Sequence, residues 1–206
     1  MSVDLHTHTE ASFDSDCTMA QRVALADDAG ITTIACTDHN AVHPRLDDRT
    51  QMIDGIEVIA GVELFTRGQY GRIDVLGLMI DPAMMRKQVP AEGREKIAYR
   101  EAIDRIHDAG GVAIMAHPGR YDTDLEAAVQ HLLEHGVDGI ETAYPYEFVS
   151  DPMPYTPHER IVRIAQEYDL LETGGSDCHG TRRQHIGAIR LDEAVLRKLR
   201  QRAAMG

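Results

Sequence analysis

Short apolar runs alternate with longer amphipathic segments along the whole chain, and this alternation constrains the fold more than any other feature. The apolar runs are bounded by Gly, Pro or Asp and are mostly rich in β-branched residues, which is typical of buried strands. The runs centred on Leu76 and Ile114 barely alternate with polar residues, as expected for parallel strands covered on both faces. The predicted strands are residues 3–5, 31–37, 56–62, 73–80, 112–116, 137–140 and 170–173.

The segments between these runs have helical periodicity. Gly follows three of them directly, and Gly just past the last turn is a common helix stop. The stretch 41–54 is harder to assign, and a short helix is one interpretation. Strand–helix alternation predicts a mostly parallel sheet, open or closed, in one α/β domain spanning residues 1–206. The predicted helices are residues 19–29, 94–109, 125–135, 157–168 and 192–203.

Polar residues stand where most of the predicted strands end. Six of the seven runs lead into acidic residues or histidines, whereas the run 73–80 has Asp74 near its start. The carboxyl ends of strands are where α/β barrels keep their chemistry. These residues are therefore the candidates for a site: His6, His8, Asp38, His39, Glu63, His117, Glu141, Asp177 and His179.

The segment DLHTHT at residues 4–9 carries two histidines on one predicted strand. Residues two apart on a strand share a face, so His6 and His8 can bind one ion while Thr7 points the other way. A plain surface pair is the alternative interpretation of these histidines.

The remaining candidates differ in how directly their surroundings indicate a metal. Glu63 ends a strand without an apolar reason to be there, and its two oxygens can bridge two cations. Asp177 and His179 lie among glycines that allow close backbone approach. His117 is a single imidazole at a strand end. Asp14 lies in an expected loop, where a turn or capping role is the alternative to metal binding.

Charge and cysteine content exclude several classes of protein. A formal net charge of -13 disfavours an extended nucleic-acid surface, which needs a basic patch. Three scattered cysteines do not make a disulfide framework. No apolar stretch reaches the roughly 18 residues that would span a bilayer, and residues 1–6 lack the basic and apolar regions of a signal peptide. We therefore expect a cytoplasmic protein without a membrane partner.

Taken in order, five motifs resemble those of the PHP family, the polymerase and histidinol phosphatase domain. The resemblance runs from Asp4 to about Leu199. Any one motif is weak, but all five in the family's order make the resemblance specific. The motifs are DLHTHT at residues 4–9, TDHN at 37–40, GVE at 61–63, AHPGR at 116–120 and GGSDCHG at 174–180.

This resemblance implies a distorted, TIM-like (β/α) barrel of seven strands with two or three divalent metal ions at its C-terminal mouth. Mixed nitrogen and oxygen ligands suit zinc, manganese or iron, without a choice among them. Carried over position by position, the resemblance implies a first metal site at His6, His8, Glu63 and Asp177, a second at Glu63 and His117, and a third at Asp14, His39 and His179.

The chain departs from the family pattern at two positions. Many members have a histidine where Asp74 stands, although an aspartate can still bind a hard cation. Asp74 is therefore retained as an expected ligand of the second site. Tyr144 stands where a histidine often precedes a proline, and we expect it to contact substrate.

The expected activity is metal-dependent hydrolysis of phosphate esters by a hydroxide that bridges metal ions at a di- or trinuclear site. Glu63 and Asp177 are the carboxylates assigned to this reaction, and Arg120 is expected to bind the phosphoryl group and offset its developing charge. The general acid stays open among His158, His185 and a water molecule. His185 is also expected to line the substrate site.

The expected substrate is a small phosphorylated metabolite or a nucleotide, by analogy only. Histidinol phosphate is one alternative substrate. A metal-binding module without turnover is a second alternative, and a hydrolase of amides or lactones is a third. An assay of phosphate esters beside amides and lactones separates these hypotheses, while the oligomeric state does not follow from the sequence.

Overall fold

The computed structural model describes residues 2–90, 93–146, 156–180 and 186–205. Each of the seven predicted apolar runs contains one strand of the main sheet, so these predictions are confirmed. An eighth strand, β3, was not predicted. The strands are β1 (Val3–Thr7), β2 (Thr33–Cys36), β3 (Thr50–Ile53), β4 (Ile56–Leu64), β7 (Val75–Leu78), β8 (Val112–Met115), β9 (Gly139–Ala143) and β10 (Leu171–Gly174).

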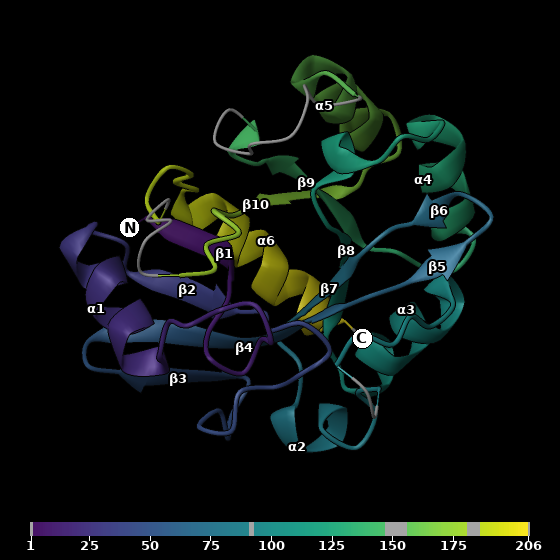
Figure 1. Ribbon diagram of the computed structural model, residues 1–206. Helices are drawn as coiled ribbons and strands as arrows, with labels where there is room; N and C mark the ends of the chain where they lie inside the picture. The colour runs from purple at the N-terminus through teal and green to yellow at the C-terminus, as the bar shows by residue number, and fades with distance from the viewer. Residues whose placement is uncertain (1, 91–92, 147–155, 181–185, 206) are drawn as a thin grey trace.

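The main sheet curls until its first strand meets the segment that follows its last strand. The strands follow one another in the order β1-β2-β4-β7-β8-β9-β10. Beyond β10, Asp177 N donates to His6 O at 2.8 Å and His8 N donates to Cys178 O at 3.1 Å. The result is the expected distorted barrel, and Figure 1 shows its strands arranged around α6.

One strand of the barrel runs against its neighbours. The pairs β1–β2, β2–β4, β8–β9 and β9–β10 are parallel, whereas β7 is antiparallel to both β4 and β8. The beginning of β7 therefore lies at the same edge as the carboxyl ends of the parallel strands. This reversal explains why Asp74 precedes its strand: it reaches the same edge as Glu63 and His117.

The interpretation of residues 41–54 as a short helix is wrong within the described residues. Thr50–Ile53 instead forms β3, which pairs antiparallel with β4, and Ile53 lies opposite Ile56. Asp54 and Gly55 both have positive φ, 46° and 89°. An Asp-Gly pair in this conformation makes the two-residue turn that joins hairpin strands.

The five predicted helices are present with somewhat shorter bounds. A short helix, α2, and a 3-10 turn, η1, add to them, and a small hairpin of β5 (Arg67–Gly68) and β6 (Gly71–Arg72) precedes β7. No helix in the described ranges combines the length and apolar character needed to cross a bilayer. The helices are α1 (Met19–Asp28), α2 (Pro82–Met85), α3 (Tyr99–Asp108), α4 (Leu125–Leu133), α5 (His158–Glu167) and α6 (Glu193–Ala203), with η1 at Pro118–Arg120.

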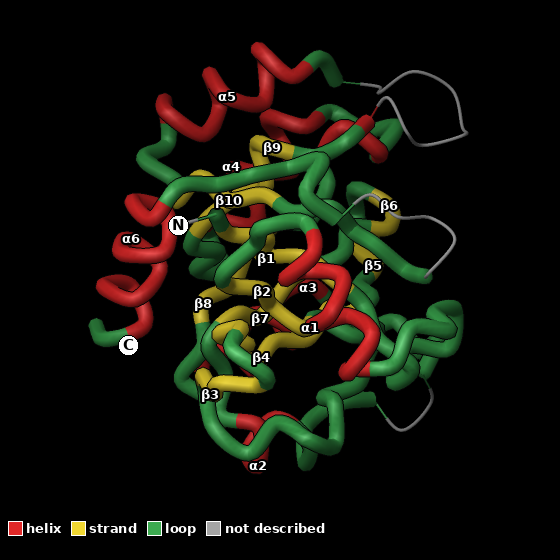
Figure 2. The backbone as a smooth tube through the Cα atoms, turned by 90° about the vertical axis from the view of Figure 1, so that its left-hand side faces the viewer, coloured by secondary structure: helices red, strands yellow, loops and turns green. Residues whose placement is uncertain are grey.

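Two apolar layers hold the barrel together. The larger lies between the outer face of the sheet and the surrounding helices. The smaller fills the interior, where Leu5, Ile59 and Ile114 pack with Leu196 and Leu199 of α6. Figure 2 shows α6 on one side of the sheet and the β5–β6 hairpin on the other. Since each buried leucine contributes about 1.5–3 kcal/mol, α6 closes the barrel interior with apolar side chains and leaves the opposite edge to polar groups.

Candidate metal centre

A β-bulge in β1 directs the first histidine into the barrel. The chain advances three residues from Asp4 to Thr7 while the paired strand β2 advances two. Leu5 and His6 consequently both oppose Ala35, whose side chain belongs to the interior layer. A bulge of this kind re-aims a side chain that strict alternation would place on the other face. His6 thus enters the interior directly after an apolar residue does.

Four buried ligand atoms converge at the end of β1 and form the first metal group. The Nε2 atoms of His6 and His8 lie 3.1 Å apart, and Glu63 Oε2 lies 3.3 Å from each. Asp177 Oδ1 lies 3.3 Å from His6 Nε2 and 3.1 Å from His8 Nε2, yet it is buried without a hydrogen-bond partner. Two imidazole nitrogens and two carboxylate oxygens in this arrangement fit one divalent cation.

Buried groups behind these histidines fix how their rings are turned. Glu141, from β9, accepts from the backbone N–H of His117 at 2.7 Å, and its oxygens lie 3.1 and 3.2 Å from His6 Nδ1. His8 Nδ1 lies 3.0 Å from Ser12 Oγ. When Nδ1 of His6 donates to Glu141, its Nε2 lone pair is left for a metal ion, which is the usual way such ligands are oriented.

Asp38 shapes the loop that follows β1. Its oxygens accept from Thr9 N and Thr9 Oγ1, both at 2.7 Å, and from Ser12 Oγ at 2.9 Å. Asp38 is fully buried. Its carboxylate is therefore used in holding residues 8–12 in place, while its neighbour His39 contacts the cluster.

A second group forms beside the first around two histidines. The Nε2 atoms of His39 and His179 lie 3.1 Å apart, and Asp14 Oδ2 lies 3.4 and 3.6 Å from them. The His8 ring stacks on that of His179 at 3.9 Å between centroids. His39 Nδ1 is buried and 2.9 Å from Glu63 Oε2, but not in hydrogen-bond geometry. Such unpaired nitrogens suit a second cation.

Glu63, Asp74 and His117 make up a third group at the reversed strand. His117 Nε2 lies 2.9 Å from Glu63 Oε1, and its Nδ1 lies 3.0 Å from Tyr121 Oη. Arg72 donates to both oxygens of Asp74 at 2.6–3.0 Å. This group brings together the predicted residues, but its atoms already have partners in the protein.

The backbone is constrained where the ligands enter the cluster. His117 has φ 27° and Asp177 has φ 52°, a region that costs about 1–3 kcal/mol for residues other than glycine. A Cβ on Gly175 would lie 2.4 Å from both the Cβ and the backbone nitrogen of His6. Glycine is therefore required where the segment after β10 crosses β1, as the sequence predicted.

The cluster keeps its carboxylates ionised. Burial alone would raise the pKa of Glu63, but the positive charges of His39 and His6 hold it well below its usual range. Burial likewise opposes ionisation of Asp177, and His6 together with a hydrogen bond from His8 lowers its pKa well below normal. Burial and the charge of His8 lower the pKa of His179 to about 4. The anionic carboxylates and the neutral His179 are the forms that bind a divalent cation.

Arg120 and Tyr144 hold the outer oxygen of Asp177. Tyr144 donates to Asp177 Oδ2 at 2.6 Å, and Arg120 Nη1 donates to Tyr144 Oη at 3.1 Å and to Asp177 Oδ2 at 3.4 Å. Burial and the Asp177 charge raise the pKa of Tyr144, which keeps the phenol protonated. Because the Arg120 side chain is 44% exposed, it can also reach an anion from solvent.

Two predicted histidines are not brought to the cluster by any contact in the structure. His158 is the first residue of α5 and is exposed. None of the hydrogen bonds or ion pairs among the described residues joins it to the cluster. His185 lies outside the described residues. The roles of both histidines stay predictions.

Sequence reasoning missed two arginines at the cluster. Arg22 of α1 is fully buried and donates to His8 O at 3.0 and 2.8 Å and to Cys178 O at 2.8 Å. A helical arginine normally reads as exposed, so the sequence carried no signal for it. Arg72 did carry one, because it precedes Asp74 by two residues and so shares its face.

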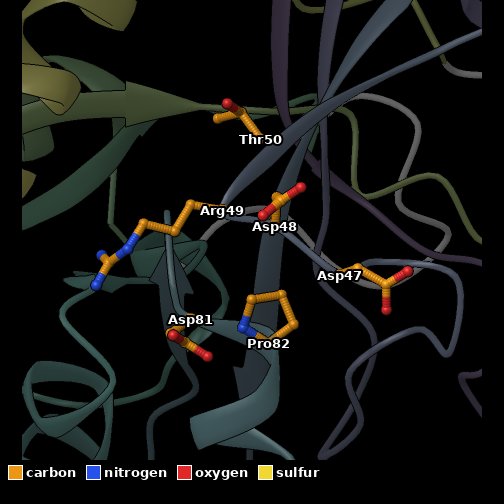
Figure 3. Close-up of a pocket in the computed structure, with 6 residues that line it drawn as sticks. All are labelled: Asp47, Asp48, Arg49, Thr50, Asp81 and Pro82. Carbon is orange, nitrogen blue, oxygen red and sulfur yellow. The ribbon is translucent and has the colours of Figure 1, made fainter.

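A hollow of about 390 Å³ lies away from this cluster, beyond the end of β7 that is remote from Asp74. In Figure 3 the Asp47 and Asp81 carboxylates lie on either side of Pro82, and the Arg49 side chain extends away from Asp47. None of the close groups of metal-ligating atoms found among the described residues includes these side chains. The hollow is thus separate from the candidate metal centre.

Comparisons of sequence relate this chain to phosphoester-cleaving proteins. The PHP domain profile matches residues 4–76. A protein of Shewanella sp. strain MR-4 named a probable phosphatase is 30% identical over 192 residues, which cover 86% of this chain and 76% of that protein. The 5'-3' exoribonuclease Rnm of Escherichia coli K12 is 26% identical over 256 residues, covering 85% of this chain and 84% of the nuclease.

A comparison of structures supports the same fold. A candidate metal-dependent phosphoesterase from Bifidobacterium adolescentis superposes with a TM-score of 0.73 at 19% identity. The superposition covers 97% of this chain and 96% of the other. At this identity the likeness establishes the barrel, and the chemistry depends on the cluster and the sequence relatives.

Proposed function

This chain belongs to the PHP domain family, and from that premise we propose that it hydrolyses a small phosphorylated molecule at the cluster around His6 and Glu63. Metal-dependent phosphoesterase activity is what the family relationship supports. The substrate, the number of ions and the residue roles below are the proposal.

One observation carries the proposal: four buried ligand atoms face a common point without satisfying one another. Asp177 Oδ1 has no hydrogen-bond partner although it is buried, and two Nε2 atoms lie 3.1 Å apart. A buried polar atom without a partner is costly, so such a group is expected to hold an ion. When bound, divalent ions would lower the pKa of a water molecule and polarise a phosphoryl group.

The chain's own residues are proposed to position these components. Glu63 directs Oε2 toward the first group and Oε1 toward His117, so it can link two positions. Tyr144 and Arg120 hold Asp177 Oδ2 and thereby keep Oδ1 turned toward the histidines. The exposed part of Arg120 is proposed to bind the phosphoryl oxygens and to offset charge that develops on them.

The proposed substrate class is a small phosphomonoester or a nucleotide. It is supported by relatives named as a phosphatase and as an exoribonuclease, which both act on phosphate esters. The net charge of -13 disfavours binding along an extended nucleic acid. The non-catalytic alternative is not favoured, because ligand-capable side chains stand at every position of the first group. Histidinol phosphate remains one compound to assay within the proposed class.

The test is a hydrolysis screen of the purified protein loaded in turn with Mn²⁺, Zn²⁺ and Fe²⁺. Phosphomonoesters, nucleotides, histidinol phosphate and diesters should be assayed beside amides and lactones. We expect metal-dependent release of phosphate, abolished by a chelator and strongly reduced in Arg120→Ala. Cleavage of amides or lactones without phosphate release would replace the proposal by the other hydrolase class. Inactivity on every compound with ions bound would leave the metal-binding module.

A further inference from the structure

The three groups of ligand atoms in the cluster differ in whether their atoms are already paired. The first two contain buried atoms without a hydrogen-bond partner, Asp177 Oδ1 and His39 Nδ1. In the third, His117 contacts Glu63 and Tyr121 through its two ring nitrogens, and both oxygens of Asp74 accept from Arg72. Only the first two groups therefore show unmet demand for a cation.

Arg72 is held against Asp74 from several directions. Its Nε donates to Oδ1 and Oδ2, both at 3.0 Å, and its Nη2 donates to Oδ2 at 2.6 Å. The guanidinium carbon lies 4.5 Å from the centre of the Phe65 ring, in cation–π geometry. The backbone N–H of Asp74 donates to Tyr121 Oη at 2.8 Å. Forked pairing of this kind is among the stronger side-chain interactions in proteins.

Charge balance explains why a cation belongs at this place. Glu63 is fully buried and Asp74 is 1% exposed, and two buried carboxylates close together require positive charge nearby. A divalent ion would supply it in a site with a neutral histidine in place of Asp74. In this chain the guanidinium of Arg72 already supplies one positive charge, so the third group is neutralised without an ion.

We infer that the Arg72 guanidinium takes the place of a metal ion at the Glu63–Asp74–His117 group. The chain then binds two divalent ions tightly, one at each of the first two groups, and a third ion weakly. To bind there, an ion must displace Arg72 from Asp74, which should weaken binding about 10- to 100-fold. The inference rests on the proposed function, since it assumes that the first two groups hold metal ions.

The test counts bound ions and does not depend on activity. Protein stripped with a chelator is titrated with Mn²⁺ by calorimetry, and the ions retained after desalting are counted by elemental analysis. The wild type should retain two ions per chain. Arg72→Met should gain a third ion with affinity raised about 10- to 100-fold at that position. Arg72→Lys, which keeps the charge beside Asp74, should retain two.

Arg67→Met is the matched control. Arg67 is exposed and pairs with Arg72 across the same hairpin, so this variant loses the same charge without releasing Asp74. It should retain two ions. Circular dichroism establishes that each variant is folded.

The possible failures separate the two proposals. Three ions of similar affinity in the wild type, or no ion gained in Arg72→Met, would overturn the role of Arg72 and leave the proposed function standing. A wild type that retains no ion would overturn the proposed function, and with it this inference.

Discussion

The parallel and the reversed parts of the barrel contribute to the cluster in different ways. From the parallel part, His6 and His8 follow β1 and Asp177 follows β10, and their ligand atoms converge without satisfying one another. From the reversed strand β7, Asp74 enters at the beginning of the strand already paired with Arg72. The difference teaches that two carboxylates at one edge of a barrel can serve opposite ends, one awaiting a cation and the other carrying one.

The largest expected effect comes from removing a ligand on the parallel side. His6→Ala leaves Asp177 and Glu63 facing each other without a nitrogen ligand, so the first ion should be lost. Since changes to residues that merely support a ligand cost about 10- to 100-fold, phosphatase activity should fall by at least about 100-fold. Asp74→Ala should lower it far less. Equal losses in steady-state kinetics would remove the distinction between the two sides, and His135→Ala, outside the cluster, is the control.

Crowding at the closure of the barrel should have the next largest effect. In Gly175→Ala the new Cβ would lie 2.4 Å from the Cβ and backbone nitrogen of His6, so β1 and the following segment must separate. Overpacking of this kind costs about 1–3 kcal/mol of unfolding free energy, measured in urea, and metal affinity should fall with it. Gly93→Ala meets no atom within 4 Å and should change stability by less than about 0.5 kcal/mol.

Arg22 sharpens the comparison, because it supports only the parallel side. Its guanidinium bonds to His8 O and Cys178 O, which flank the ligands of the first group. Arg22→Met leaves these buried carbonyls without donors, at a cost of about 1–3 kcal/mol. Thermal unfolding and Mn²⁺ titration should both report the change. The exposed helical Arg163→Met is the control, and unchanged Mn²⁺ affinity in Arg22→Met would show that the arginine serves stability alone.

The smallest expected effect is a pH dependence beside the reversed strand. His107 of α3 lies 2.9 Å from Asp138, and that hydrogen bond raises the pKa of His107 above its usual value. A pKa raised by folding gives stability that is complete below the unfolded value, about 6.5, and is lost as the pH rises through the folded value. His107→Gln should therefore be destabilising near about pH 5.5 and nearly neutral near about pH 8.5.

The size of this effect should be only a few tenths of a kcal/mol, because the His107 side chain is 38% exposed and solvent screens the pair. Urea unfolding of both proteins at the two pH values measures it. A difference that is larger at high pH would contradict the assigned sign.

Much of the barrel could be predicted from the sequence because buried strands carry a local apolar signature. Strand direction could not, since Leu76 and its neighbours have the same pattern whichever way the strand runs. The reversal of β7 was visible only indirectly, in the misplaced Asp74. The hairpin at Asp54-Gly55 was readable from its turn residues, and the helix interpretation failed because that signal was overlooked.

The candidate site divides in the same way. His6, His8, Glu63, Asp177 and His179 could be proposed from their place at strand ends, because parallel strands bring those ends together. Partners that come from elsewhere in the chain could not be proposed. Nothing local to the helix containing Arg22 indicates that its side chain reaches the loops after β1 and β10.

The central claim is that the atoms converging at the end of β1 hold a metal ion. Diffraction from crystals grown with Zn²⁺, recorded at the zinc absorption edge, tests it most directly. We expect a strong anomalous peak at about 2.0–2.2 Å from His6 Nε2, His8 Nε2, Glu63 Oε2 and Asp177 Oδ1, with Arg72 still paired to Asp74. A map without a peak among these four atoms would contradict the account.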